Sequence, residues 1–344
     1  MLLREDLEKR EYDTLSDRAS KAAETKGRRY HEEKDPVRTD FMRDRDRIIH
    51  SKAFRRLMHK TQVFLGSEKD HYRTRLTHTL EVSQIARTIS RALMLNEDLT
   101  EAIALGHDLG HTPYGHNGEY ILNEIHEGGF RHNEQSLRVV DFLESSPSKP
   151  GIRGMNLTYE VRDGILNHSG KGFPSTLEGQ VVRLSDRIAY INHDIDDAIR
   201  SGVISDADLP RGPIALFGGT HSKRIGNMVM NAVRYSEGRD TVSMEPEYME
   251  NMNELREFMF KRVYNSPLVK KEADLKKVDT VIRSLYQYFL EHPEEIPETE
   301  AELIRQDGVR TVVKDYIAGM TDRYADRTYE RIFGRGTPTD NSDR

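Results

Sequence analysis

Apolar residues recur at helical spacing over most of this chain, and this spacing restricts the fold more than any other feature. In residues 73–95 they follow the i, i+3, i+4, i+7 pattern that places them on one face of a helix. The same spacing returns in residues 248–264, 273–293 and 309–333. No convincing run of alternating polar and apolar residues appears, although residues 240–244 are compatible with a short edge hairpin. The sequence therefore predicts an all-α protein.

Residues typical of helix starts and ends define two of the expected helices. One helix is expected to begin near Asp98 and to stop at Gly110 and Pro113; another spans 175–204, with Ser175 or Thr176 as cap and Gly202 as stop. We expect an N-terminal helical arm, a helical core, and a helical C-terminal extension that packs on the core and ends in a flexible tail. These units are expected to span residues 1–39, 40–210 and 211–344.

Composition excludes several classes of protein. The chain has 344 residues, 36% hydrophobic and 32% charged, with no apolar run of about 18 residues that would span a membrane. The N-terminus lacks the apolar region of a signal peptide, so we expect a cytoplasmic protein without a membrane partner. The net charge of −6 argues against a protein whose main task is to coat nucleic acid. Because cysteine is absent, any metal must be bound by His, Asp or Glu.

Basic residues crowd into one stretch, residues 43–62. Such a cluster has two equally good explanations. It is either the solvated face of an amphipathic helix or a site for phosphate, a regulatory nucleotide or nucleic acid. The residues are Arg43, Arg45, Arg47, Lys52, Arg55, Arg56 and Lys60.

Four side chains on three expected helices suggest a metal site. His78 shares a face with the apolar stripe of its helix; alone it would be interpreted as a core histidine. His107 and Asp108 close an apolar helix, and Asp186 lies on or near the buried face of its own helix, where an unpaired carboxylate is costly. Two imidazoles and two carboxylates suit one divalent ion per site; Mn, Mg, Fe, Co, Ni and Zn all remain open.

The order and separation of these ligands resemble those of the HD phosphohydrolase superfamily. Further blocks resemble its deoxynucleoside triphosphate triphosphohydrolase (dGTPase-like) branch over residues 40–330. They are SKAFRRLMHKTQVF, RTRLTHTLEV, HDLGHTPYGHNGE, FRHNEQS, NLTYEVRDGIL, LSDRIAYINHDIDDA and DYIAGMTDRYA. The resemblance implies an HD-domain helical core and metal-dependent hydrolysis of a dNTP, dGTP or a broader set, to a deoxynucleoside and tripolyphosphate.

The resemblance also implies roles for residues around the metal. Arg75 and Arg187 would bind the phosphates, with His111 and His132 around them. His116, nine residues after His107, would be the acid or base, oriented by Glu119. On the sugar side, Tyr190 would exclude a 2′-hydroxyl, while Asp194 and Gln62 would bind the 3′-hydroxyl. Core packing of Tyr190 and a solvated Asp194 remain alternatives. His168 either lines the pocket or ends a helix, and we favour the helix end. No role beyond a base pocket or subunit contact is assigned to Asp315, Tyr316 and Arg323.

Two other functions remain open. The same metal site suits a nucleoside monophosphatase or phosphodiesterase of the wider superfamily, and a nucleotide or single-stranded DNA sensor would keep the fold without the reaction. The family implies a homo-oligomer, often a hexamer, and a second dNTP as an allosteric activator. Phosphate-binding loops of the Walker or Rossmann type are not indicated by the glycine spacing.

Overall fold

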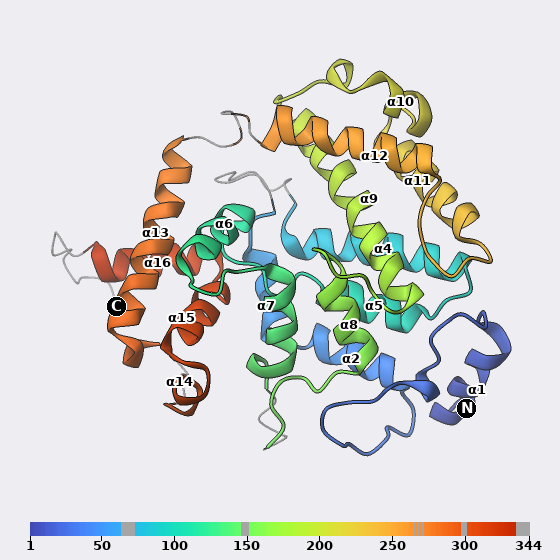
Figure 1. The fold of residues 1–344 in the computed structure, drawn as a ribbon, viewed down its shortest axis with the longest axis horizontal. Coiled ribbons are helices and arrows are strands. Elements are labelled where there is room, and N and C mark those ends of the chain that lie inside the picture. The colour runs from blue at the N-terminus through green and yellow to red at the C-terminus, as the bar shows by residue number, and fades with distance from the viewer. Residues whose placement is uncertain are drawn as a thin grey trace.

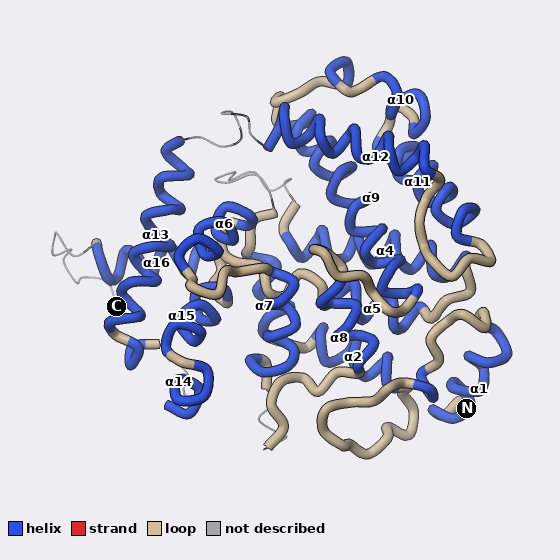
Figure 2. Tube along the Cα trace, viewed as in Figure 1, coloured by secondary structure: helices blue, strands red, loops and turns tan. Residues whose placement is uncertain are grey.

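The structure is a computed structural model that describes residues 1–62, 73–145, 151–264, 266, 269, 272–296 and 301–334. In these ranges the chain consists of helices joined by loops, without a strand, which confirms the all-α prediction (Figure 2). Residues 240–244, compatible with a hairpin by sequence, lie instead in the loop between α11 and α12. Within the described ranges, no helix combines the length and apolarity needed to cross a bilayer.

The helices follow one another along the chain, and some connections are long, such as residues 15–39 between the first two helices (Figure 1). Their bounds are α1 (Arg4–Thr14), α2 (Asp40–Ile49), α3 (Lys52–Arg56), α4 (Arg75–Ala92), α5 (Glu97–Gly106), α6 (Gly115–Ile125), α7 (His132–Arg138), α8 (Tyr159–Asn167), α9 (Leu177–Arg200), α10 (Arg211–Phe217), α11 (His221–Ser236), α12 (Pro246–Met259), α13 (Glu272–Glu291), α14 (Ala301–Asp307), α15 (Val309–Ala318) and α16 (Asp322–Phe333). Short 3₁₀ or π turns are η1 (Ala22–Glu24), η2 (Leu57–His59), η3 (Val139–Leu143), η4 (Asp206–Asp208), η5 (Phe260–Tyr264) and η6 (Pro293–Glu295).

Two hydrophobic cores organise these helices. The larger core contains side chains of α2, α4, α5, α8 and α9, together with α11 and α12, which pack on α9. The smaller core joins α6 to α13, α15 and α16, the group on the left of Figure 1. The α6 helix follows directly on the turn after α5, so the 107–116 segment connects the two cores.

Polar caps set the ends of the two helices that matter most for the site. Asn96 caps α5 by accepting from the Leu99 amide at 3.1 Å, two residues before the cap expected at Asp98. The α5 helix ends at Gly106, so His107 lies just past its last residue. Thr176 caps α9 as expected, because its hydroxyl accepts from the Gly179 amide at 3.1 Å.

The basic stretch has more than one environment in the structure. Arg45 forms an ion pair with Asp98 at 2.8 Å, and a guanidinium nitrogen of Arg47 donates to the Met155 carbonyl at 2.8 Å. Both arginines thus join α2 to other parts of the larger core. By contrast, Lys52, Arg56 and Lys60 line a cavity described below.

Candidate metal centre and its surroundings

The four predicted ligands converge from α4, α9 and the turn directly after α5. Nε2 of His78, on α4, lies 3.1 Å from Oδ1 of Asp186, on α9, and 4.0 Å from Oδ2 of Asp108. Nε2 of His107 lies 3.5 Å from Oδ1 of Asp108 and 3.8 Å from Oδ1 of Asp186. The α4, α5 and α9 helices pack on one another, which brings residues more than 100 positions apart into one cluster.

The protonation pattern of His107 fits a metal ligand. Its Nδ1 donates to the Ala104 carbonyl at 2.7 Å, so the lone pair of the neutral ring is on Nε2. That Nε2 is buried, faces Asp108 and Asp186, and has no hydrogen-bond partner among the described residues. A buried acceptor between two carboxylates is costly unless a cation binds there. Two imidazoles and two carboxylates are a donor set for one divalent first-row ion or Mg²⁺.

Arg75 lies one turn before His78, with its side chain buried against the cluster. One terminal nitrogen donates to Oδ2 of Asp108 at 2.9 Å. The Nε and the other terminal nitrogen are buried without a hydrogen-bond partner among the described residues. Although burial raises the pKa of Asp108, neighbouring cationic groups including Arg75 hold that pKa well below its usual value.

Three of the predicted residues, His116, His132 and His111, gather around Glu119 on α6. Glu119 accepts from Nδ1 of His116 at 3.1 Å, and from Nδ1 of His132 at 2.8 Å. Burial works against ionisation of Glu119, but these hydrogen bonds lower its pKa below the usual range, so it is a carboxylate. The ring of His111 stacks on that of His132 at 4.1 Å and lies 3.1 Å from Asp108.

The pKa values of these rings are shifted in different directions. His168 donates through Nδ1 to the Ile165 carbonyl at 2.7 Å, and burial lowers its pKa to about 3. Nε2 of His132 lies 3.3 Å from both the His168 Nε2 and the Ser169 hydroxyl, while its Nδ1 donates to Glu119. Burial works against protonation of His132, but the hydrogen bond to Glu119 raises its pKa, whereas burial and Arg75 lower the pKa of the stacked His111 well below its usual value.

The predicted sugar-binding residues lie on α9 and on the loop before α4. Tyr190 is half-buried and Asp194 is buried one turn further along α9. Burial raises the pKa of Asp194 to about 7, and its carboxyl accepts a short hydrogen bond from the Tyr264 hydroxyl. Gln62 is buried, and its side-chain oxygen has no hydrogen-bond partner among the described residues. Arg187 points elsewhere: it donates to Asn253 of α12 at 2.8 Å.

Two residues of this region were not singled out as site residues by the sequence. His168 ends α8, as interpreted, yet it also lies in the cluster, with its ring centroid 4.9 Å from that of His107. Tyr264 reaches Asp194 from η5, seventy residues away along the chain. A histidine at a helix end gives no signal of what it faces, and the spacing of Tyr264 is that of its own amphipathic helix.

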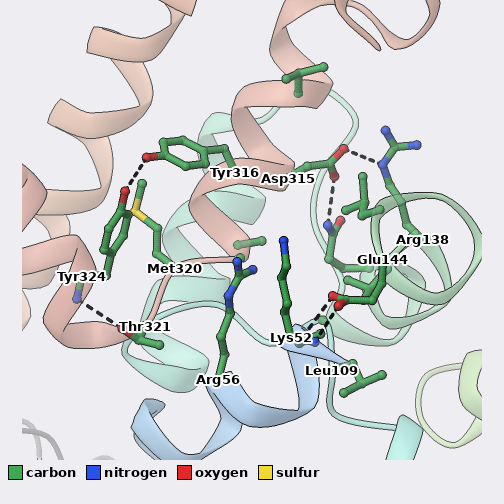
Figure 3. Close-up of a pocket in the computed structure, with 18 of the residues that line it drawn as sticks. Lys52, Arg56, Leu109, Arg138, Glu144, Asp315, Tyr316, Met320, Thr321 and Tyr324 are labelled. Carbon is green, nitrogen blue, oxygen red and sulfur yellow. Dashed lines mark hydrogen bonds and ion pairs between the residues drawn. The ribbon is translucent and has the colours of Figure 1, made fainter. Parts of the chain in front are cut away.

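A separate cavity of about 460 Å³ opens beside Leu109 and Gly110 (Figure 3). Arg56 and Lys52 enter it from α3, and Tyr316 and Tyr324 lie on the opposite side, with their hydroxyls 3.0 Å apart. At its right-hand edge Arg138 pairs with Asp315 at 2.7 Å. The described lining includes none of the four predicted metal ligands.

Comparison with known proteins agrees with this geometry. The HD domain family model matches residues 75–191, which contain all four predicted ligands, and the phosphohydrolase-associated domain model matches 242–331. A phosphohydrolase structure from Bacteroides thetaiotaomicron has the same fold, with a TM-score of 0.52 and 16% identity over 85% of this chain and 69% of that one.

Sequence relatives are much closer. A deoxyguanosinetriphosphate triphosphohydrolase-like protein of Caldanaerobacter subterraneus is 57% identical over 97% of this chain and 96% of its own. A protein of the same name from Clostridium tetani is 46% identical over 97% of both chains. These matches confirm the resemblance found in the sequence. The chain therefore belongs to the deoxyguanosinetriphosphate triphosphohydrolase-like family of HD-domain phosphohydrolases.

Proposed function

We propose that this protein hydrolyses deoxynucleoside triphosphates to a deoxynucleoside and tripolyphosphate, with one divalent ion held by His78, His107, Asp108 and Asp186. The observation that carries this proposal is Arg75. Two of its buried guanidinium nitrogens have no partner among the described residues, and its third is fixed on a predicted ligand. A guanidinium held in this way offers paired donors to a phosphate beside the ion.

The row of histidine rings beside the predicted metal ligands favours a triphosphate over a monophosphate. His111 and His132, whose pKa is raised, extend from the predicted ligands toward the exposed His116. A chain of phosphates running along these rings would meet the charge of a protonated His132 and the exposed ring of His116, whereas a single phosphate uses only Arg75 and the ion. A bound ion supplies Lewis-acid stabilisation of negative charge on a phosphoryl oxygen.

His116 is the proposed acid for the departing 5′-oxygen. Its Nδ1 is fixed on the ionised Glu119, which leaves Nε2 directed away from that carboxylate. Its side chain is 68% exposed, so substrate can reach it. A proton on this Nε2 can pass to the leaving oxygen. Tyr190, Asp194 and Gln62 are proposed to bind the deoxyribose.

The direct test is product analysis. Purified protein with Mn²⁺ or Mg²⁺ is incubated with each dNTP alone and with all four together, and phosphates are separated by ion chromatography. We expect tripolyphosphate and deoxynucleoside in equal amounts. Orthophosphate from a nucleoside monophosphate, without tripolyphosphate from any dNTP, would favour the nucleotidase or phosphodiesterase alternative.

The sensor alternative makes a separate prediction. A single-stranded DNA shift that is the same in wild type and in His116→Ala, with no hydrolysis by either protein, would favour a binding protein. Intact predicted ligands and an intact His116–Glu119 pair argue against it, because binding alone needs neither.

The family also implies a second dNTP as activator and a homo-oligomer. We propose the cavity of Figure 3 for the activator, because Arg56 and Lys52 supply cationic groups and Tyr316 an aromatic face for a base. Arg56→Gln is expected to raise the concentration of the second dNTP that is needed for activation. At saturating concentrations of all four dNTPs, turnover by the variant should equal that of the wild type. Light scattering with and without nucleotide tests the oligomeric state, for which we expect a hexamer or a dimer-based assembly.

A further inference from the structure

The segment from Asp315 to Asp326, here called the α15–α16 corner, is not used by the proposed chemistry. It comprises the end of α15, the turn at residues 319–321 and the first turn of α16. It nevertheless contacts three parts of the chain that carry predicted site residues. These are the loop at residues 60–62, which carries Gln62, the turn at 111–116, which carries His111 and His116, and α7, which begins with His132.

Asp322 joins two of these parts through a single carboxylate. Its Oδ2 accepts from the backbone amide of Thr61 at 3.1 Å and from the Thr61 hydroxyl. Its Oδ1 accepts from the backbone amide of Tyr114 at 2.8 Å. One side chain thus fixes the residue before Gln62 and the residue two before His116 relative to each other. Among the described residues, neither amide donates to a backbone carbonyl.

Lys60 makes a second connection between the same parts. Its side chain is buried, and its ammonium nitrogen donates to the carbonyls of His111 and Ala318, the latter at 2.8 Å. The corner therefore supplies an acceptor to Lys60 and two acceptors through Asp322. On the third part, Asp315 accepts from Gln135 of α7 at 2.9 Å.

The backbone at the 111–116 turn needs such support. Tyr114 is a non-glycine residue with φ of 61°, in the left-handed region, where a side chain carries a steric cost. Gly115, with φ of 60°, approaches the 60–62 loop so closely that a Cβ there would lie 3.0 Å from the Gln62 carbonyl oxygen. A strained turn against a neighbouring loop persists only where other contacts hold both. Asp322 supplies the contact to both.

We propose that Asp322 is a positioning residue that sets His116 at the 5′-oxygen and Gln62 at the 3′-hydroxyl of the same substrate. The proposal rests on the function proposed above. The carboxylate of Asp322 contacts the two loops and, among the described residues, none of the four predicted metal ligands. Its loss should therefore disturb turnover while leaving metal binding in place.

Asp322→Asn is the informative variant. The amide has one oxygen, so in either orientation its NH₂ group faces one of the two backbone amides, and one loop loses its acceptor. We expect kcat for tripolyphosphate release to fall by about 10- to 100-fold, as small misplacements of catalytic groups do. Mn²⁺ affinity, measured by calorimetry, should stay within about twofold of the wild type, since a change this small is under 0.5 kcal/mol.

The matched control is Asp326→Asn, one turn further along the same helix. Asp326 accepts from the Tyr114 hydroxyl at 2.9 Å and pairs with Lys277 at the surface. The asparagine oxygen keeps the first contact, and the exposed ion pair contributes little. This variant should match the wild type in kcat and in hydrogen exchange.

Hydrogen–deuterium exchange followed by mass spectrometry gives a readout that is independent of activity. In Asp322→Asn, peptides covering 60–62 and 112–119 should exchange faster, while peptides of α4 and α9 should be unchanged. Turnover within twofold of wild type, unchanged exchange in both loops, or loss of Mn²⁺ affinity in parallel with kcat would each overturn the proposal. If the wild type released no tripolyphosphate, the proposed function would fail, and exchange in the two loops alone would decide the role of Asp322.

Discussion

At His107, one ring nitrogen donates to the Ala104 carbonyl and the other faces Asp108 and Asp186. We therefore expect His107→Ala to abolish measurable Mn²⁺ binding in calorimetry. Metal at about 100 times its dissociation constant should stabilise the wild type by about 2.7 kcal/mol and the variant not at all. Asp196→Asn, on the same α9 helix as Asp186 but paired with Arg200, is the control and should bind metal normally. Equal stabilisation of wild type and His107→Ala by metal would refute the ligand assignment.

Arg75 offers a second test at single-residue scale. Arg75→Lys keeps the charge and loses the fork of donors, so one ammonium must serve both Asp108 and substrate. We expect kcat/KM for a dNTP to fall by about 10- to 100-fold, corresponding to about 1.5–3 kcal/mol for a hydrogen bond to a charged group. Steady-state kinetics with Arg91→Lys as control checks this, because Arg91 lies on the same helix with an exposed side chain that pairs with Glu97. An unchanged kcat/KM in Arg75→Lys would remove Arg75 from the proposed phosphate site.

The sequence predicted those site residues that need a specific kind of partner when they are buried. A buried carboxylate such as Asp186 needs a partner, and the spacing to His78 and His107 indicated which ones. The protonation states of His111 and His132 could not be predicted, because they depend on Glu119, His168 and a stacking distance that only the fold sets.

At the scale of elements, the turn after α5 is held against α7 by close backbone packing. A Cβ at Gly110 would lie 2.2 Å from the backbone nitrogen of Ser136 and 2.5 Å from the carbonyl oxygen of His132. These are backbone atoms of α7, which cannot swing away as a side chain can. We expect Gly110→Ala to destabilise the protein by about 1–3 kcal/mol in urea unfolding, the usual cost of overpacking.

The matched substitution is Gly226→Ala on α11, where a Cβ would meet nothing within 4 Å. Because alanine is the better helix former, this variant should gain about 0.5–1 kcal/mol. Equal effects of the two substitutions would mean that the close approach of the turn to α7 is not tight in solution.

The start of a helix was predicted correctly where its capping signal was strong, and incorrectly where two capping residues lay close together. Thr176 caps α9 as expected, but α5 begins after Asn96, whose side chain accepts from Leu99, and not near Asp98. Asn and Asp are both good capping residues, so tertiary contacts decide between the two positions. The backbone amide of Asn96 also donates to the buried carboxylate of Glu178.

At the scale of the whole molecule, the sequence indicated amphipathic helices at the C-terminal end but not their partners. Apolar stripes on α13 and α15 specify burial without specifying a neighbour, and the structure packs both into a core with α6. The α6 helix carries His116 and Glu119, so the C-terminal helices support the proposed catalytic pair. The DYIAGMTDRYA block, for which the sequence assigned no role beyond a base pocket or subunit contact, therefore lies in the part of the chain that supports α6.

The contact between the two cores includes a buried lysine with a pH-dependent contribution to stability. Burial, helped by Arg56 and Arg75, lowers the pKa of Lys60 from 10.5 to about 7. Between these two values the unfolded chain binds more protons than the folded one, so stability rises with pH. Relative to Lys60→Met, the wild type should gain up to about 1.4 kcal/mol per pH unit above pH 7, by denaturant unfolding at several pH values. Parallel stability curves for the two proteins would contradict the lowered pKa.

The proposed reaction can be followed directly by hydrolysis of a dNTP in H₂¹⁸O with Mn²⁺ and mass spectrometry of both products. If water attacks the α-phosphorus and the bond to the 5′-oxygen breaks, tripolyphosphate carries one ¹⁸O and the deoxynucleoside carries none. His107→Ala should give neither product. Label in orthophosphate or pyrophosphate, with a deoxynucleotide as the other product, or label in the deoxynucleoside, would contradict the account.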